Sequence, residues 1–320
     1  MKEIIVDLLG SDYGQDELLT GVIDAIRKYP SYNFVCSGIK KDIESRLKKE
    51  GISLDQVKIL DTDKVVTNND NPMLIARGEL LDTSLLLSIN YLKENEDAIG
   101  LITAGSTGAT LVSARFKLGL IPNIQTPALG ALLKHYNGKD FLLLDCGANL
   151  TFTSDKYVEF AQIGDAFMKA YMKISNPRVA LLNVGKEEHK GSEQLKNAYA
   201  SLKEKDINFI GNIEGNDVFL DKADVVVADG FTGNVILKNA ESVGLICSNL
   251  AKDSNKELSN KINSLFNYTA LGGALVLGTK KIIYKAHGSS KASSIVPICN
   301  DLINLDKNSY IDIITKEFSK

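Results

Sequence analysis

The chain has 320 residues, 44% of them hydrophobic and 24% charged, which is ordinary for one large globular domain or two intimate lobes. Its formal net charge of −3 argues against general nucleic-acid binding, because there is no excess of basic residues for a phosphate backbone. The four cysteines are widely spaced and form no CxxC or Cys/His cluster, so we expect no zinc site and no disulfide scaffold. We expect no other metal and no cofactor.

The chain predicts an alternation of strands and helices along its whole length. Apolar side chains recur at helical spacing in some segments and form continuous runs typical of buried strands in others. We expect strands at residues 3–8, 33–37, 57–60, 99–103, 125–133, 141–145, 179–184, 225–229 and 281–285. We expect helices at residues 16–27, 40–50, 73–92 (broken near Gly78), 154–173, 190–205, 233–250, 254–266 and 291–303. The opening segment does not resemble a signal peptide and no apolar stretch reaches transmembrane length, so a cytoplasmic location is the default expectation.

The order of these elements predicts a three-layer α/β/α fold with a mostly parallel sheet. Only residues 135–140 separate the strands at 125–133 and 141–145, so these two strands are expected to pair as a hairpin. No long linker or repeat divides the sequence, and we expect residues 1–320 to form a single α/β/α unit with a cleft. No GxGxxG follows the first strand and no GxxxxGK[ST] occurs, which argues against a dinucleotide-binding fingerprint and a P-loop NTPase.

Four of the predicted strands run directly into glycine-containing polar loops. These loops span residues 104–110, 146–149, 185–191 and 230–234. Ligands of parallel sheets bind outside the carboxyl ends of the strands. Glycine there lets backbone N–H groups approach a ligand closely, and a following helix N-terminus favours an anion. The pattern therefore predicts a site for a phosphate-bearing or phosphate-like ligand.

The loop at 104–110 contains the first group of candidate binding residues, which are Gly105, Ser106, Thr107 and Gly108. Its N–H groups and two hydroxyls could hold phosphate oxygens. The same residues also fit a tight turn in which a serine or threonine caps a helix. The sequence alone leaves both interpretations open.

The segment from Asp229 to Asn234 places a carboxylate, a hydroxyl and an amide within six residues. The Asn234 amide could donate a hydrogen bond to a developing oxyanion, and such donors are worth about 3–4 kcal/mol. A capped helix start is the alternative interpretation. Further binding candidates follow the ends of two predicted strands. Gly230, Thr232 and Gly233 follow the strand at 225–229, and Asn149 follows the strand at 141–145.

Three basic side chains, Lys186, His189 and Lys190, lie in the loop at 185–191 between or beside two glutamates. A lysine there could neutralise a phosphate as a point charge, whereas a solvated charge run is the more ordinary interpretation. Lys190 is the preferred candidate because it directly precedes a glycine and the next predicted helix.

Two further residues, His287 and Cys146, have side chains that could be either reactive or structural. His287 follows the predicted strand at 281–285 and could act as acid or base, hydrogen-bond a ligand, or have a structural role. Cys146 lies at a strand end, but no histidine is near it in sequence, so a small buried apolar role fits better than a nucleophile.

Eight segments together resemble the bacterial phosphate acyltransferase family, the acyl-ACP:phosphate acyltransferases of PlsX type. They are residues 6–12 (VDLLGSD), 104–109 (AGSTGA), 144–149 (LDCGAN), 182–185 (LNVG), 187–191 (EEHKG), 209–215 (FIGNIEG), 229–235 (DGFTGNV) and 285–290 (KAHGSS). Each segment is weak alone, but their order and spacing cover nearly the whole chain.

This resemblance implies a homodimeric fold related to phosphotransacetylases and isocitrate-dehydrogenase-like enzymes. It also implies that an acyl group moves from acyl carrier protein to inorganic phosphate, giving acyl phosphate for phospholipid synthesis. Lys190 and Asn234 fall where the family's proposed catalytic lysine and asparagine lie, and Asp229 and His287 would orient neighbouring groups. No cofactor and no enzyme nucleophile are needed, since a thiolate is a competent leaving group.

Other functions are left open by two departures from the family pattern. The opening loop, residues 8–15, differs from the family's usual sequence at most positions, and the helical arm at 239–268 is shorter than usual in the family. Both differences would permit acyl-CoA as the acyl donor. A non-catalytic paralogue that binds a carrier protein is the third hypothesis. In the family the arm is implicated in membrane docking; here its few basic residues predict only weak, reversible peripheral contact, and packing on a dimer partner is favoured.

Overall fold

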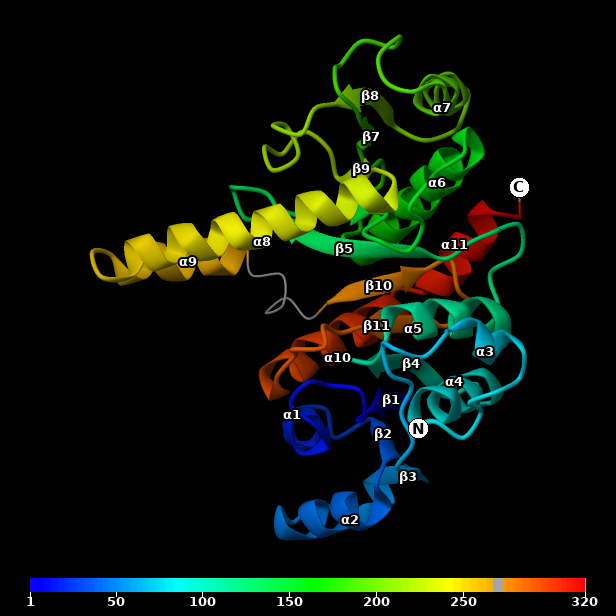
Figure 1. Cartoon of the computed structure of the whole chain (residues 1–320), viewed down its shortest axis with the longest axis vertical. Coiled ribbons are helices and arrows are strands. Elements are labelled where there is room, and N and C mark those ends of the chain that lie inside the picture. The colour runs from blue at the N-terminus through cyan, green and yellow to red at the C-terminus, as the bar shows by residue number, and fades with distance from the viewer. Residues whose placement is uncertain (267–272, 320) are drawn as a thin grey trace. The chain divides into compact units, whose positions relative to one another are not determined.

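The computed structural model describes residues 1–266 and 273–319 (Figure 1). The chain divides into two compact units: unit 1 comprises Met1–Pro127 with Thr269–Lys307, and unit 2 comprises Ala128–Tyr268 with Asn308–Lys320. Each unit combines mostly parallel strands with packed helices, which confirms the predicted α/β class. Residues 267 and 268, the end of the predicted helical arm, lie outside the described residues.

The described residues of unit 1 contain six strands in the order β3-β2-β1-β4-β11-β10. Their bounds are β1 Glu3–Asp7, β2 Asn33–Gly38, β3 Val57–Asp61, β4 Ala98–Thr103, β10 Ala274–Leu277 and β11 Ile282–Lys285. The pairs from β3 to β11 are parallel, and β10 runs antiparallel to β11. The carboxyl ends of β1, β4 and β11 therefore meet at one edge, as the strand–loop pattern requires.

Helices cover both faces of the unit 1 strands. They are α1 Gln15–Lys28, α2 Lys40–Lys49, α3 Met73–Ala76, α4 Ser84–Glu94, α5 Thr107–Ser113 and α10 Ala292–Lys307, with a short 3-10 helix Leu54–Gln56 and a π-helical turn Ala114–Leu118 after α5. Figure 1 shows α1 and α10 on one side of the strands and α4 on the other. The predicted helix at 73–92 is indeed broken, but over the wider segment 77–83.

Where the structure describes it, unit 2 contains five strands in the order β5-β6-β9-β7-β8. Their bounds are β5 Ala128–Lys134, β6 Asp140–Leu144, β7 Val179–Leu182, β8 Phe209–Ile213 and β9 Val225–Val227. β5 and β6 pair antiparallel, so the predicted hairpin is confirmed, and the remaining pairs are parallel. Three of the predicted strand–loop junctions, those after β6, β9 and β7, are thereby brought to adjacent strands.

The helices of unit 2 are α6 Ser154–Tyr171, α7 Glu193–Lys203, α8 Gly230–Lys252, α9 Lys256–Phe266 and α11 Tyr310–Glu317. The buried face of α6 packs against β6, β7 and β9 and also contacts α7 and α11. α8 and α9 pack side by side, and a Cβ at Gly244 would collide with Phe266. None of the described helices is both long and apolar enough to cross a membrane.

Several element boundaries differ from the sequence expectation for local reasons. α7 begins at Glu193 rather than near Lys190, because Gly191 has a φ of +86° and the Ser192 hydroxyl caps the helix. α8 begins at Gly230 rather than Gly233, because Asp229 caps it. The short strands β8 and β10 and the last helix α11 were not predicted, since runs of so few residues carry little periodicity.

Candidate active site

The carboxyl ends of β6, β9 and β7 bring together most of the candidate residues of unit 2. The loop after β6 contains Asn149, the segment after β9 contains the residues from Asp229 to Asn234, and the loop after β7 contains Lys190. Because β9 lies between β6 and β7, its segment is flanked by the other two loops. These residues therefore lie at the carboxyl ends of the strands, where parallel α/β sheets bind their ligands.

The buried carboxylate of Asp145 organises the loop after β6. Its Oδ1 accepts hydrogen bonds from the backbone N–H of Leu129 (3.0 Å) and Ala148 (3.1 Å), and its Oδ2 accepts from the backbone N–H (2.6 Å) and the Nδ2 (3.0 Å) of Asn149. Burial raises the pKa of Asp145, and these hydrogen bonds oppose the rise. Asn149 is thus held from two sides, and its amide nitrogen is committed to Asp145.

Two glycines let the first turn of α8 pack directly on this loop. The Gly230 N–H donates to the Asn149 carbonyl oxygen at 2.8 Å, and a Cβ at Gly230 would lie 2.5 Å from that oxygen. A Cβ at Gly233 would collide with the Asp145 carbonyl oxygen. Gly230 and Gly233 are therefore required by close packing, whether or not they also contact a ligand.

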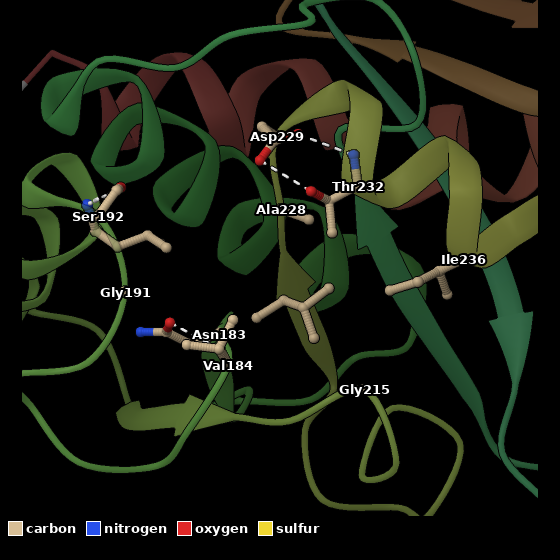
Figure 2. A pocket seen from close by; sticks show the side chains of 11 residues that line it. Asn183, Val184, Gly191, Ser192, Gly215, Ala228, Asp229, Thr232 and Ile236 are labelled. Atoms are coloured by element: carbon tan, nitrogen blue, oxygen red, sulfur yellow. Dashed lines mark hydrogen bonds between the residues drawn. The ribbon is translucent and has the colours of Figure 1, made fainter.

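Asp229 is the N-cap of α8, so the capped helix start is confirmed. Its Oδ1 accepts from the Thr232 N–H at 2.8 Å and its Oδ2 from the Thr232 hydroxyl at 3.0 Å (Figure 2). The Tyr157 hydroxyl also points at Asp229 (3.5 Å), and burial together with this carboxylate raises the pKa of Tyr157. Asp229 and Thr232 are thus engaged with each other, and their shared role is to fix the first turn of the helix.

Asn234 lies on a different face of the same turn. A Cβ at Gly147 would lie 3.8 Å from the Cβ and Cγ of Asn234, so this side chain lies against the loop after β6. Asn234 is exposed, and no hydrogen bond ties its amide to another part of the described chain. The Asn234 amide is therefore available to a ligand at the strand ends.

The loop after β7 is closed at its base by Asn183. Asn183 Nδ2 donates to the Lys190 carbonyl oxygen at 3.1 Å, and its Oδ1 accepts from the Val184 N–H at 2.8 Å. Lys186 is bound to Asp217 by an ion pair of 2.8 Å. Lys190 is exposed and forms no ion pair with any carboxylate in residues 1–266 or 273–319. Of the lysines in this loop, Lys190 is the one with an uncommitted charge.

A pocket of about 280 Å³ lies between the segments after β7 and β9 (Figure 2). Its lining includes Asn183 and Val184 at the end of β7, Gly191 and Ser192 beside Lys190, and Thr232 on α8. Neither Asn183 nor Ser192 was among the candidate site residues predicted from the sequence. Asn183 could have been found from its position, because it lies near the end of the predicted strand at 179–184, just before the glycine-containing loop at 185–191.

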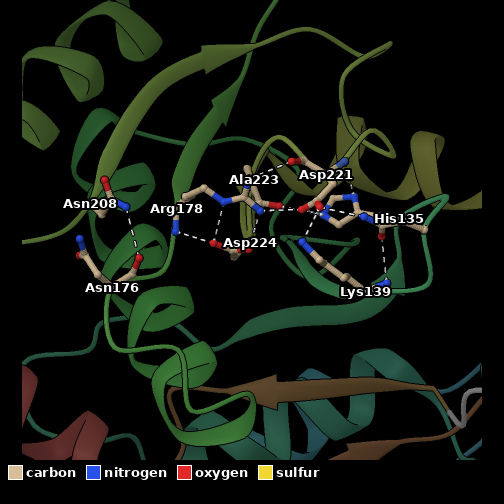
Figure 3. Close-up of polar contacts among 9 residues, drawn as sticks. His135, Lys139, Asn176, Arg178, Asn208, Asp221, Ala223 and Asp224 are labelled. Carbon is tan, nitrogen blue, oxygen red and sulfur yellow. Dashed lines mark hydrogen bonds and ion pairs between the residues drawn. The ribbon is translucent and has the colours of Figure 1, made fainter.

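A network of ion pairs occupies the opposite end of the same strands (Figure 3). The Arg178 guanidinium pairs with Asp221 (2.7 Å) and Asp224 (2.8 Å). Lys139 and Arg178 together lower the pKa of Asp221, and Arg178 lowers the pKa of Asp224 although burial opposes this shift. His135 Nδ1 accepts from the Asp221 N–H at 3.0 Å, so the ring proton is on Nε2, which faces the Ala223 carbonyl oxygen at 3.0 Å. This network joins the connections that precede β7 and β9, and we assign it a structural role.

In unit 1, the loop at 104–110 begins directly after β4. The Ser106 hydroxyl accepts from the Ala109 N–H at 3.5 Å as the N-cap of α5, so the capping interpretation is confirmed for Ser106. The Gly105 N–H donates to the Thr103 hydroxyl at 3.1 Å. Thr107 is the first residue of α5, and Gly108 lies within its first turn.

His287 lies in the loop that follows β11 in unit 1. Its Nδ1 accepts from the Ser289 N–H at 3.2 Å and lies 2.7 Å from the Ser289 hydroxyl, so a neutral ring carries its proton on Nε2. The Gly288 carbonyl oxygen accepts from the Asp12 N–H at 2.8 Å and from the Ser11 hydroxyl at 3.3 Å. The altered opening loop therefore packs on the loop that holds His287.

Two buried charged groups at this edge of unit 1, Asp7 and Lys285, were not among the candidates predicted from the sequence. Burial raises the pKa of Asp7 to about 6, although Asp7 accepts hydrogen bonds from Thr103 (2.8 Å) and Ser37 (3.4 Å). Burial lowers the pKa of Lys285 to about 8, and its ammonium donates to the carbonyl oxygens of Ala104 and Ala286. Both residues lie in segments that carry the family resemblance, and each ends a strand.

The structure divides the candidate residues between the two units. Asn149, Lys190, Asp229, Asn234 and the residues between the last two belong to unit 2, whereas the loop at 104–110 and His287 belong to unit 1. Cys146 is buried, and burial raises the pKa of its thiol, in line with the apolar role expected for it. In residues 1–266 and 273–319, no group of three or more His, Cys, Asp or Glu side chains is placed to hold a metal ion.

Comparison with known proteins shows the family of this chain and its type of fold. A family model described as "Fatty acid synthesis protein" matches residues 2–302. The chain is 34% identical to a phosphate acyltransferase of Clostridium novyi, over 98% of this chain and 97% of that protein. It is 35% identical to a phosphate acyltransferase of Acetivibrio thermocellus, over 98% and 96%. A solved phosphotransacetylase from Streptococcus pyogenes has a TM-score of 0.65 at 15% identity, covering 97% of this chain and 94% of that one, which shows a shared fold.

Proposed function

We infer the activity of this chain from its family, because it belongs to the fatty acid synthesis proteins and its relatives over nearly the full length are phosphate acyltransferases. The chain is an enzyme, an acyltransferase of lipid synthesis that uses phosphate as the acceptor. The observation that carries this conclusion is the identity of 34–35% over 98% of the chain. The uncommitted side chains of Lys190 and Asn234 at adjacent strand ends support it.

We propose acyl carrier protein as the acyl donor and acyl phosphate for phospholipid synthesis as the product. A phosphate oxygen attacks the thioester carbonyl carbon, and the carbonyl oxygen takes up negative charge in a tetrahedral intermediate. The intermediate then collapses, the C–S bond breaks, and the thiolate leaves and is protonated by water. Because the thiolate leaves readily, the protein needs only to position the phosphate and to stabilise the oxyanion.

Within unit 2 we assign these tasks to the two uncommitted side chains. Asn234 donates a hydrogen bond to the oxyanion, and Lys190 supplies positive charge to the phosphate. Asp229 acts as a positioning residue, since its bonds to Thr232 hold the first turn of α8 and with it Asn234. Asn149 supports the same turn through its carbonyl oxygen.

Within unit 1 we assign phosphate binding to the loop at 104–110. Thr107 and the amides of Gly105 and Gly108 are the proposed contacts, and Ser106 contributes chiefly as the cap of α5. His287, whose ring is oriented by Ser289, would orient neighbouring groups. Because candidate residues come from both units, we propose that the two units act together as one catalytic unit.

The test of this function is acyl phosphate formation from acyl carrier protein thioesters and from acyl-CoA, measured side by side with inorganic phosphate. Acyl phosphate can be trapped with hydroxylamine as a coloured hydroxamate complex. The proposal predicts faster turnover with the carrier protein thioester. Equal or faster turnover with acyl-CoA would replace the proposed donor, and no product from either would overturn the activity.

We further propose that the α8–α9 pair packs against a second copy of the chain. Several large apolar side chains on it are exposed, including Leu245 (60%), Ile246 (57%) and Leu250 (77%). Ile246 and Leu250 are four residues apart and share one face of α8, and contiguous exposed apolar side chains of this kind mark interaction surfaces. Light scattering should give the mass of a dimer, and a Leu250→Glu variant should give the mass of a monomer. Salt-resistant sedimentation of the wild type with anionic vesicles would instead assign this surface to lipid.

A further inference from the structure

The lining of the pocket between the segments after β7 and β9 includes neither Asn234 nor Lys190, the two side chains proposed to act on the oxyanion and the phosphate. Asn234 lies against Gly147, on the side of α8 that faces the loop after β6. Thr232 and Ile236 face the pocket instead, since residues four apart share one face of a helix. The pocket is therefore a neighbouring subsite, and it lies beside Gly191, the residue that follows Lys190.

The lining of this pocket is mostly apolar. Leu182 and Ala228 are buried at the ends of β7 and β9, while Leu195 on α7 and Ile236 on α8 are half-buried. Figure 2 shows Asp229 and Thr232 next to each other at the start of α8, Ile236 further along the same helix, and Val184 beside Asn183. At about 280 Å³, the volume is near the lower end of ligand pockets and suits part of a chain rather than a whole cofactor.

The charge of the lining excludes the phosphate as the occupant. The pocket is lined by the Asp229 carboxylate, and none of its lining residues is a lysine, an arginine or a histidine. A phosphate or nucleotide there would meet a carboxylate without a cation, which is unfavourable. An uncharged apolar chain meets no such penalty and gains from contact with the aliphatic side chains.

We propose that this pocket binds the apolar acyl chain of the thioester donor beyond its first four carbons, an assignment that rests on the proposed acyl transfer to phosphate. The chain enters beside Gly191 and Asp229 and lies over Leu182, Leu195 and Ile236. The pocket then sets how strongly the enzyme discriminates between short and long acyl groups. Each methylene that it removes from water should raise kcat/KM by about fourfold.

Gly215→Leu adds a large apolar side chain at the wall of the pocket and tests this assignment. Gly215 lines the pocket, a Cβ there would meet no atom within 4 Å, and its φ is one that any residue can adopt. The matched control is Asn216→Leu, which adds the same side chain to the next exposed residue, outside the lining. We expect Gly215→Leu to lower kcat/KM for a hexadecanoyl donor about tenfold or more while butanoyl transfer is unchanged.

Ile236→Ala widens the pocket and provides a second test on another element. Its control is Val235→Ala, one residue earlier on α8, where the side chain is half exposed and does not line the pocket. Ile236→Ala should lower kcat/KM for hexadecanoyl by about threefold to tenfold more than for butanoyl, because apolar contacts with the longer chain are lost. The control should show no dependence on chain length.

Binding of hexadecanoyl pantetheine without phosphate, measured by calorimetry, separates this assignment from the proposed function. If no thioester yields acyl phosphate but Gly215→Leu still weakens this binding, the activity is wrong and the acyl pocket stands. The acyl assignment is overturned if Gly215→Leu leaves both binding and kcat/KM at wild-type values. It is also overturned if butanoyl and hexadecanoyl transfer fall equally, because the pocket would then hold the thiol side of the donor.

Discussion

Replacing Asp145 by alanine should destabilise unit 2 more than replacing Asp140, an acidic residue on the surface at the other end of β6. Asp145→Ala removes the acceptor of four hydrogen bonds, from Leu129, from Ala148 and twice from Asn149. The Leu129 N–H is buried and loses its partner outright, at about 1–3 kcal/mol, whereas the two loop residues are half-buried and can be partly rehydrated. Relief of the buried carboxylate offsets part of the loss, so we expect a net cost of about 3 kcal/mol.

The assay is thermal unfolding of Asp145→Ala and of Asp140→Ala, a control at the other end of β6. Asp140 forms a partly exposed ion pair with Lys134 at 2.6 Å, and such pairs contribute about 0–1 kcal/mol. For a domain of this size, 3 kcal/mol corresponds to a fall in Tm of about 6–12 °C. A Tm for Asp145→Ala within 2 °C or so of the control would refute the reasoning that this carboxylate holds the loop after β6 together.

The remaining predictions concern the site and its pH dependence. Asn234→Ala should lower kcat by about 10²–10³ with an unchanged Tm, because the exposed amide makes no hydrogen bond to the described chain. Lys190→Ala should raise the KM for phosphate, whereas Lys186→Ala, which breaks the ion pair with Asp217, should not; equal effects of the two variants would remove Lys190 from the mechanism. Burial raises the pKa of Asp7 from 3.8 to about 6, so the folded state binds the proton more tightly and loses stability as the pH rises through this window. Asp7→Asn should therefore be more resistant to urea than the wild type at pH 7, with a difference that vanishes near pH 4 or so; a constant difference would contradict this.

The sequence by itself determined the class of fold and the places where chemistry is concentrated. Continuous apolar runs and helical periodicity predicted most strands and helices, because burial imposes these patterns on the chain directly. The glycine loops after β4, β6, β7 and β9 were visible for the same reason: each strand ends in a change from apolar to polar residues. Short strands such as β8 and β10 were not predicted, because four or five residues show too little hydrophobic periodicity.

Only the tertiary structure decided what each candidate residue does. Asp229 and Ser106 are helix caps, an alternative that the sequence could state but not choose, because capping depends on where the chain turns. Asp145 and Lys285 were overlooked, because their importance comes from burial among groups that are distant in sequence, such as Leu129 and Ala104.

The division of α8 into faces likewise depends on the fold. Asn234 faces the loop after β6, whereas Thr232 and Ile236 line the pocket beside the loop after β7. In the sequence these residues are within five positions of one another and are indistinguishable in kind from other polar and apolar helix residues. The order of the strands, with β9 between β6 and β7, places a different loop on each side of this helix, and strand order is a property of long-range pairing that local sequence patterns do not carry.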